Sequence, residues 1–140
     1  MLDWKLFAIG SAFFAGLTAV LAKVGVKDIP SNLATLIRTI VIIVFLCILV
    51  GMRQEWKNPL LLNRRCLIFL VLSGITTGLS WLCYYRALQN GPASVVAPID
   101  KLSLAVAILL SVAFLGEHLN LYQWLGAGLI VTGTFIVILK

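Results

Sequence analysis

Long apolar blocks alternate with short polar connections along this chain. Five blocks have about the 20 apolar residues that cross a hydrocarbon core, and they comprise residues 4–26, 33–52, 66–88, 93–115 and 121–139. None alternates with the period of two that marks a barrel strand, and a spanning segment must satisfy its own backbone hydrogen bonds. The pattern therefore predicts an all-α, polytopic membrane protein: a compact bundle of five transmembrane helices in a single domain over residues 1–140.

The connections between the blocks are too short to hold a soluble domain. The longest is the basic segment 53–65. In the last connection, Asn120 is followed three residues later by Gln123, which predicts a capping box at the start of the fifth helix.

Composition and charge agree with a membrane protein. Hydrophobic residues make up 61% of the chain and charged residues 11%, against about 45–50% and about 25% in soluble domains. A net charge of +6 would suggest a nucleic-acid partner in a soluble protein. Here the basic residues flank apolar spans, and no basic–aromatic platform lies in a polar segment. We therefore expect a lipid bilayer, and no nucleic acid, as the partner of the chain.

The sequence has little with which to bind a metal or catalyse a reaction. The three cysteines lie in or beside apolar spans without C-x-x-C spacing, which is typical of small core residues. The single histidine, His118, lies in a short connection, and no nucleophile and base form an active-site set. We expect no enzyme, no metal site and no cofactor.

Small residues follow one face of three predicted helices. The third helix has Gly74 and Gly78 in G-x-x-x-G spacing, and Gly126 and Gly133 align in the fifth. A similar face of the first helix ends at Lys23. Because such stripes let helix backbones approach closely in lipid, they predict tight packing.

Asp100 and Lys101 lie inside the fourth block, just after Pro98. A charge at a helix centre costs about 2.5–3.5 kcal/mol on the insertion scale. Neighbours on a helix point about 100° apart, so we expect at least one of the two to find a partner on another helix or in water. Asp100 shares a face with Ser103, and Pro98 leaves a backbone carbonyl without its helical donor. Two interpretations stay open: an ion pair that fixes helix packing, or a substrate or ion site near the midplane, where transporters bind their substrates.

Two more cations lie within spans. Lys23 and Arg38 are about two turns from the membrane edge, and both side chains are long enough to reach the interface. Lys23, however, is on the small-residue face, which should pack against protein. Trp81 and Tyr85 continue the glycine face of the third helix, so Trp81 belongs either to an interfacial aromatic belt or to a cavity wall. The candidate substrate and ion site thus comprises seven residues: Asp100, Lys101, Arg38, Lys23, Trp81, Tyr85 and Ser103.

Four segments carry a resemblance to a known family. They read, in order, LAKVGVKDIPSNLATLIR, GLSWLCYYRAL, GPASVVAPIDKLS and FLGEHLNLYQWLGAGLIVTG. Together they resemble the EamA domain of the drug/metabolite transporter superfamily over essentially the whole chain. Most members of that family join two five-helix halves, inverted relative to each other, around a central cavity. This chain is similar to the short bacterial and archaeal members, which have one half.

The resemblance implies a secondary transporter that exports small metabolites or drug-like compounds across the plasma membrane, the inner membrane of a bacterium or archaeon. The acidic residue that the related small multidrug-resistance transporters use in their first helix has no counterpart in residues 4–26, so Asp100 is the one deeply placed carboxylate. The alternative is a non-transporting membrane subunit of a larger complex, in which Asp100 and Lys101 are an assembly pair.

The positive charges give only a weak orientation signal. Five helices put the two ends of the chain on opposite sides, and five Lys or Arg residues fall on each side when Lys101 is set aside. Excluding the embedded Lys23 and Arg38 leaves a modest preference for a cytoplasmic N-terminus. We expect a homodimer around a small-molecule substrate, and an antiparallel one, because that arrangement rebuilds the inverted halves of larger transporters.

Overall fold

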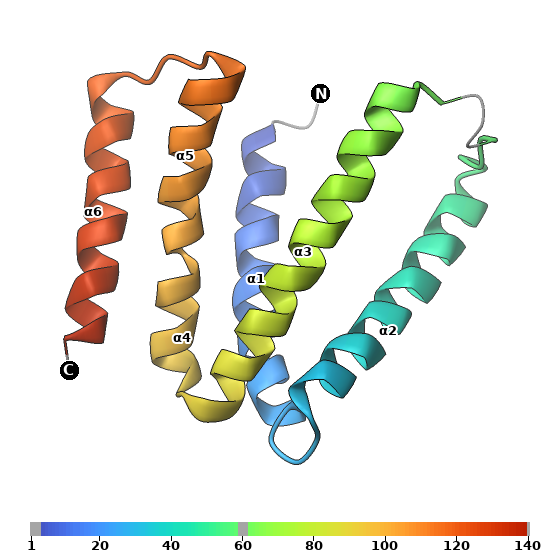
Figure 1. Ribbon diagram of the computed structural model, residues 1–140, viewed down its shortest axis with the longest axis horizontal. Helices are drawn as coiled ribbons and strands as arrows, with labels where there is room; N and C mark the ends of the chain where they lie inside the picture. The colour runs from blue at the N-terminus through green and yellow to red at the C-terminus, as the bar shows by residue number, and fades with distance from the viewer. Residues whose placement is uncertain (1–3, 59–61, 140) are drawn as a thin grey trace. The chain divides into compact units, whose positions relative to one another are not determined.

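The computed structural model describes residues 4–58 and 62–139, in which the regular elements are helices (Figure 1). Their bounds are α1 Trp4–Gly25, α2 Ser31–Met52, α3 Arg64–Asn90, α4 Ala93–Asp100, α5 Leu102–Leu115 and α6 Leu121–Ile138. No strand occurs among the described residues. The helices α4 and α5 continue one another across Lys101, so residues 4–58 and 62–139 contain 5 helical segments that are long and apolar enough to cross a membrane. The prediction of an all-α protein with five spans is confirmed.

The helix ends lie within two residues of the predicted ones. Helix α2 begins two residues early, at Ser31, and α3 is two residues longer at each end, from Arg64 to Asn90. The added residues are polar. They extend the helices into the interfacial region, where hydropathy gives no signal of helix but water and headgroups can solvate the side chains.

Two spans begin directly after a proline. Pro30 and Pro92 have φ of −57° and −69° with extended ψ of 136° and 141°. Their carbonyls accept the first helical hydrogen bonds, from the N–H groups of Ala34 and Val96, each over 3.0 Å. Because the ring fixes φ, each proline gives its connection a defined end and orients the helix that follows.

The α5–α6 connection has the chemistry that the sequence predicts. Asn120 accepts a hydrogen bond from the N–H of Gln123 over 2.9 Å and donates its own N–H to Oε1 of Gln123 over 2.7 Å. The predicted capping box is confirmed. At the other end of the connection, Gly116 closes α5 with φ of 67°, a left-handed conformation in which a side chain would be strained.

By their internal contacts the described residues form two compact units. The α4–α6 unit comprises residues 4–21 and 91–139, which include most of α1 with α4, α5 and α6. The α2–α3 unit comprises residues 22–58 and 62–90, which include the last turn of α1 with α2 and α3. Each unit has buried side chains of its own, and the single domain over residues 1–140 stays a prediction.

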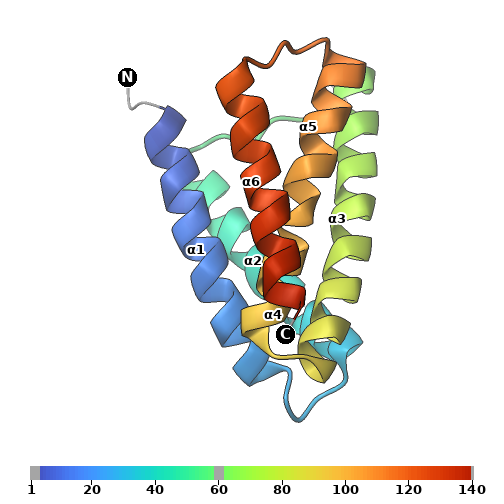
Figure 2. The ribbon, with the colours of Figure 1, turned by 90° about the vertical axis from the view of Figure 1, so that its left-hand side faces the viewer.

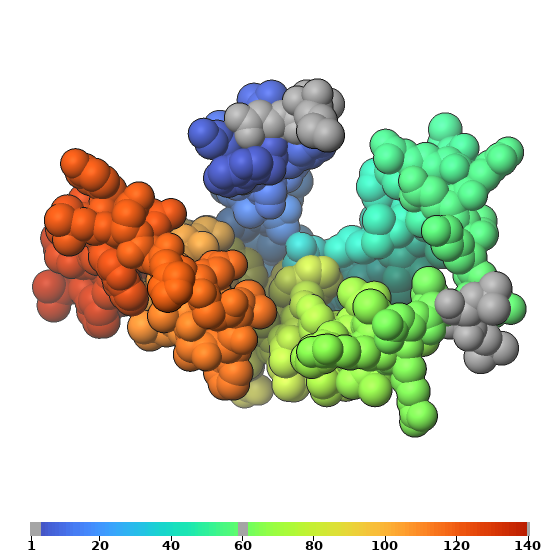
Figure 3. Space-filling model, turned by 90° about the horizontal axis from the view of Figure 1, so that it is seen from above, coloured from blue at the N-terminus to red at the C-terminus, as the bar shows by residue number. Residues whose placement is uncertain are grey.

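In the α2–α3 unit, α2 and α3 are close where α2 begins and α3 ends, and they diverge toward the segment that joins them (Figure 1). Seen from above in Figure 3, the side chains at the end of α2 and at the start of α3 form separate groups. The core of the unit lies at the closed end, where Val26 and Leu88 are fully buried and Tyr85 and Ala34 nearly so.

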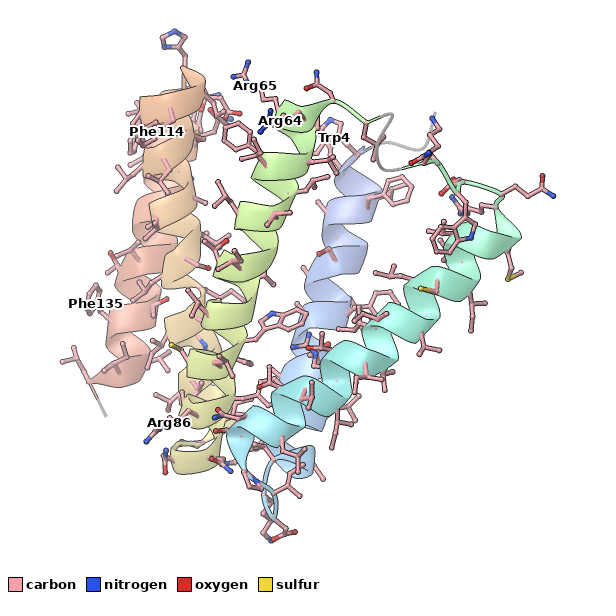
Figure 4. The ribbon with its side chains drawn as sticks, turned by 45° about the vertical axis from the view of Figure 1, so that its right-hand side comes forward. Trp4, Arg64, Arg65, Arg86, Phe114 and Phe135 are labelled. Carbon is pink, nitrogen blue, oxygen red and sulfur yellow. The ribbon has the colours of Figure 1, made fainter. Side chains whose placement is uncertain are left out.

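In the α4–α6 unit, α6 packs against both α4 and α5 (Figures 1 and 2). Few side chains are buried: Val96 on α4, Thr134 on α6 and Ala19 on α1. Large apolar side chains such as Phe114 and Phe135 point away from the helices (Figure 4). Such exposure suits a membrane, because lipid tails are as apolar as the side chains themselves.

Basic residues bracket the longest span. Figure 4 shows Arg64 and Arg65 at one end of α3 and Arg86 near the other. All three are exposed, as expected of side chains that reach the headgroup region on either side of the hydrocarbon core.

The glycine faces that were predicted to pack tightly are open within their own units. A side chain added at Gly74, Gly78, Gly126 or Gly133 would meet no neighbouring atom within 4 Å. The three cysteines are free and exposed as well, so their interpretation as core residues is wrong. These faces are therefore available to lipid or to a second chain.

Candidate functional site

The fourth span is interrupted where the candidate charges lie. Helix α4 ends at Asp100, and Lys101 forms a turn with φ of −70° and ψ of −10° before α5 begins at Leu102. The N–H of Lys101 donates to the carbonyl of Pro98 over 3.0 Å, three residues back instead of four. Pro98 itself has no N–H to give to Ser94. Irregular backbone of this kind is tolerated in membranes where it is packed in protein or lines a cavity.

Asp100 and Lys101 form an ion pair with each other. Nζ of Lys101 lies 3.6 Å from Oδ2 of Asp100, and the two side chains are 49% and 36% exposed, respectively. Among the described residues, neither has an ion-pair partner on another helix. An exposed pair is stabilised by only about 0–1 kcal/mol, which is less than the cost of about 2.5–3.5 kcal/mol for one such charge in hydrocarbon. The two groups therefore need water, a ligand or another chain to complete their environment.

A shallow groove of about 410 Å³ lies between α4 and α6 beside this break. Pro98 and Lys101 line one side, and Gly133 and Thr134 line the other. The remaining lining residues are apolar: Ala97, Leu129, Ile130 and Val137. The groove thus lies beside Lys101 and is mostly apolar, and a few polar residues among apolar walls are typical of ligand sites.

Thr134 is a buried polar residue of this groove that sequence reasoning missed. Its hydroxyl lies 2.9 Å from the carbonyl oxygen of Ile130 and 3.4 Å from that of Pro98, and the residue is 5% exposed. Helix α6 therefore gives a polar contact to the backbone that Pro98 disturbs. Helical spacing gives no signal for Thr134, because it directly follows Gly133 and neighbours on a helix point about 100° apart.

In the described part of the chain, neither Ser103 nor Ser111 hydrogen-bonds to the ion pair. Ser103 is exposed in the first turn of α5. Ser111 donates its hydroxyl to the carbonyl of Ile108, three residues back, over 3.0 Å. Ser111 also lines a second groove, of about 570 Å³ between α5 and α6, together with Glu117 and Gln123 near the connection.

In the α2–α3 unit, Arg38 lies against two aromatic rings of α3. Its Cζ is 4.0 Å from the centre of the Trp81 ring and 5.7 Å from the centre of the Tyr85 ring. Tyr85 is buried, whereas Arg38 and Trp81 are partly exposed. Such cation–π contacts contribute about 0.5–2 kcal/mol, again less than the cost of about 2.5–3.5 kcal/mol for a charge within a span. Three predicted site residues are brought together, and the cation remains incompletely compensated.

Lys23 and Gln89 join the ends of α1 and α3. The Lys23 ammonium donates a hydrogen bond to the carbonyl of Leu88. The Gln89 side-chain amide donates to the carbonyl of Ile29 over 2.7 Å and lies 3.4 Å from that of Val26. Carbonyls at a helix end have no donors within their own helix. The contact of Lys23 satisfies one such carbonyl on α3, and Gln89 bonds to carbonyls of the connection between α1 and α2. Sequence reasoning missed Gln89 because its partners are about 60 residues away; its one signal is an amide at the end of a span.

The seven predicted site residues fall into two groups, one in each unit. The α4–α6 unit contains Asp100, Lys101 and Ser103, and the α2–α3 unit contains Lys23, Arg38, Trp81 and Tyr85. In the first group the two charges balance. In the second, no carboxylate of the described residues lies at ion-pair distance from Arg38. Nor do residues 4–58 and 62–139 place three or more His, Cys, Asp or Glu side chains where they could hold a metal ion.

Comparison with known proteins identifies relatives over nearly the whole chain. Residues 3–139 match the EamA-like transporter family. An uncharacterized transporter encoded in the cobO 3' region of Sinorhizobium sp. is 48% identical over 135 residues, which are 96% of each chain. An uncharacterized protein of Methanocaldococcus jannaschii is 29% identical over 126 residues, which are 90% of this chain and 89% of that one.

A more distant relative has a named activity. The probable 4-amino-4-deoxy-L-arabinose-phosphoundecaprenol flippase subunit ArnE of Yersinia pseudotuberculosis is 28% identical over 85 residues, 60% of this chain and 75% of that one. No solved structure matches the chain. The match over residues 3–139 agrees with the five apolar helices and with the segments that carried the resemblance. The chain is thus a multi-pass membrane protein of transporter type, and it belongs to the EamA-like transporter family.

Proposed function

We propose that this chain is a secondary transporter that exports small metabolites or drug-like compounds across the plasma membrane, and that residues 1–140 act as one five-helix unit. The observation that carries the proposal is the ion pair of Asp100 and Lys101, which is partly exposed at a break in a membrane span beside a groove. Ionisable residues inside spans are rare and mark substrate, ion or proton pathways. Family membership supports the same conclusion at the level of transport.

The two charged residues have different roles in this proposal. Asp100 binds the coupling proton or a cationic part of the substrate, because it is the one carboxylate within residues 4–26, 33–52, 66–88, 93–115 and 121–139. Lys101 binds an anionic part of the substrate or keeps Asp100 ionised. Ser103 adds a hydroxyl near the pair. Lys23, Arg38, Trp81 and Tyr85 are proposed to bind substrate as well, within the α2–α3 unit.

The working form in this proposal is a homodimer with antiparallel subunits. Most family members have two inverted halves, whereas this chain has one, and a second copy in the opposite orientation would supply the other half. The open glycine faces support the pairing, since small residues favour close helix contacts in lipid. So does the accessibility of the ion pair, which a second chain could complete.

The second candidate function is that of a membrane subunit in a larger complex. The relatives named as subunits of a flippase support this alternative, and in it Asp100 and Lys101 join the chain to a different protein. The molecule in that name joins a sugar through phosphate to an undecaprenol, which supports an amphiphilic substrate in either case. Purification separates the two: a self-contained dimer favours the transporter, and an obligate second protein favours the subunit.

Variants of the pair test its role in export. A strain that lacks the protein is complemented with the natural chain, Asp100→Asn or Lys101→Met, and exported metabolites, dimer yield and thermal stability are compared. We expect Asp100→Asn to fold and dimerise but to lower coupled export at least tenfold, and Lys101→Met to change affinity or selectivity. Lys27→Met and Asp28→Asn, an exposed adjacent pair in a connection, are matched controls that should change neither.

The structural role of the same pair predicts a different pattern. Asp100→Asn would then lower dimer yield or thermal stability, while any protein that still folds would continue to transport. A well-folded Asp100→Asn protein with unaltered, still pH-dependent export would contradict the proposed role of the carboxylate.

A further inference from the structure

We infer that Arg38, held against Trp81 and Tyr85, binds the oxyanion head of an amphiphile, a phosphate or a carboxylate. Two sources share this chemistry: a transported substrate and a membrane phospholipid. The inference rests on the proposed transport function only where the amphiphile is taken as the substrate. The oxyanion site itself rests on the geometry of the α2–α3 unit.

Arg38 lies well inside helix α2. It lies seven residues after Ser31, where α2 begins, or about 10 Å along the helix axis. The α2 span has a mean hydropathy of 2.9, the highest of the 5 spans in the described residues. A guanidinium cannot lose its proton in a protein, so α2 carries a permanent positive charge well inside its apolar segment.

The contacts of Arg38 leave its hydrogen-bonding groups available. Stacking on an aromatic ring uses the face of a guanidinium, and its five N–H donors lie around the edge. In the described part of the chain, Arg38 makes the two ring contacts and no ion pair, and the residue is partly exposed. Tyr85 is 5% exposed and one turn from Trp81, so α3 supplies a packed aromatic wall for the cation.

The chemistry of this arrangement selects an oxyanion. A guanidinium edge binds phosphate or carboxylate through two parallel hydrogen bonds. A second cation, Lys23, contacts the carbonyl of Leu88 in the next turn of the same α3 face, which adds to the positive potential. Trp81 is partly exposed beside Arg38, and its largely apolar indole ring suits the body of an amphiphile more than a small hydrated ion.

Fluorescence of Trp81 gives a direct test of binding. Replacing Trp4, Trp56 and Trp124 with Phe leaves Trp81 as the single tryptophan, and the purified chain is titrated in detergent without phospholipid. We expect hexyl phosphate to shift the emission saturably and hexanol, its neutral counterpart, to have no saturable effect. Arg38→Gln should weaken hexyl phosphate binding at least tenfold, and Arg38→Lys should weaken it less. Arg53→Gln, which changes an exposed arginine at the end of the same helix, should leave binding unchanged.

Nanodiscs distinguish the two sources of the oxyanion. Equal hexyl phosphate affinity in phosphatidylcholine discs and in discs with phosphatidylglycerol assigns the site to a substrate. Weaker affinity in the anionic discs assigns it to a phospholipid headgroup. The absence of a saturable shift, an equal response to hexanol, or an equal affinity in a folded Arg38→Gln protein would overturn the oxyanion site.

A negative result in the binding test and a negative result in the transport test count against different proposals. Loss of hexyl phosphate binding with intact export counts against the oxyanion site and leaves the proposed function in place. Intact binding in a protein that exports nothing counts against the proposed function and leaves the oxyanion site in place.

Discussion

Single charged residues inside the spans are stabilised here by three kinds of contact. Lys101 contacts a carboxylate, Arg38 the face of an indole ring, and Lys23 a backbone carbonyl at a helix end. Each contact offsets part of the cost of a charge in hydrocarbon, and the ring contacts of Arg38 leave the edge of its guanidinium for a further group. Because their charge within a span is only partly compensated, these residues are costly to the fold and suitable for binding a ligand.

Substituting Thr134 tests whether its hydroxyl stabilises the break in the fourth span. Thr134→Val removes the hydroxyl that lies near the carbonyl of Pro98 on α4, whereas Thr132→Val removes one that bonds within its own helix, to the carbonyl of Gly128 over 2.8 Å. Hydrogen bonds between membrane helices contribute about 0.6 kcal/mol on average and up to about 1.7 kcal/mol. We expect Thr134→Val to lower the free energy of unfolding in detergent by an amount in that range. Thr132→Val should change this free energy less. Equal effects of the two substitutions would contradict an interhelical role for Thr134.

At the scale of whole elements, the fourth span differs most from a regular transmembrane helix. It consists of α4 and α5 with Lys101 between them, and its backbone bonding is tightened after Pro98. The break accompanies the ion pair of Asp100 and Lys101 and lies beside the groove that Lys101 lines. Pro98 is thus part of the irregular backbone of the fourth span. Substituting Pro98 tests whether that irregular backbone matters to the ion pair.

Restoring the missing backbone donor should keep or raise thermal stability and should lower export. Pro98→Ala supplies an N–H for the carbonyl of Ser94 and removes the steric restriction of the ring. We expect the variant to be at least as stable to heat as the natural chain, with lower export because the break that accompanies the ion pair is lost. Circular dichroism and the export measurement together check this expectation. Lower stability with unchanged export would show that the break is structural.

The elements could be predicted from the sequence better than the contacts between them. Hydropathy defines spans because each one must be apolar over the thickness of the bilayer, and so the helix ends agree within two residues. The capping box was predictable because Asn120 and Gln123 interact locally. The contacts of Gln89, Thr134 and Arg38 were not, because their partners are distant in sequence and no local pattern specifies them.

At the scale of the whole molecule, the chain leaves most of its apolar surface uncovered by its own units. Fully buried side chains are confined to a few positions, and the glycine faces are open. Lipid can cover apolar side chains, but it cannot complete the environment of charged groups within the spans. A second copy could do so, and the charge distribution permits both orientations, since five Lys or Arg residues are predicted on each side of the membrane.

We predict that the chain inserts into the membrane in both orientations. Reporters fused after residue 140 should find part of the population with this end in the cytoplasm and part with it outside, because neither orientation is strongly favoured by positive charge. Adding two lysines to the segment 53–65 should shift the population toward one orientation and lower dimer yield. A single orientation in every copy of the natural chain would contradict the antiparallel dimer and leave a parallel dimer or a partner protein.

In the proposed function, this chain moves a small molecule across a membrane without another protein. The most direct test reconstitutes the purified chain in liposomes loaded with a metabolite extract and follows the compounds that leave by mass spectrometry, with a proton gradient imposed or absent. We predict that at least one compound leaves at least tenfold faster than from liposomes without protein or with Asp100→Asn, and that the gradient changes its rate. Equal retention of every compound in all three preparations, with the dimer intact, would contradict the proposed transport function.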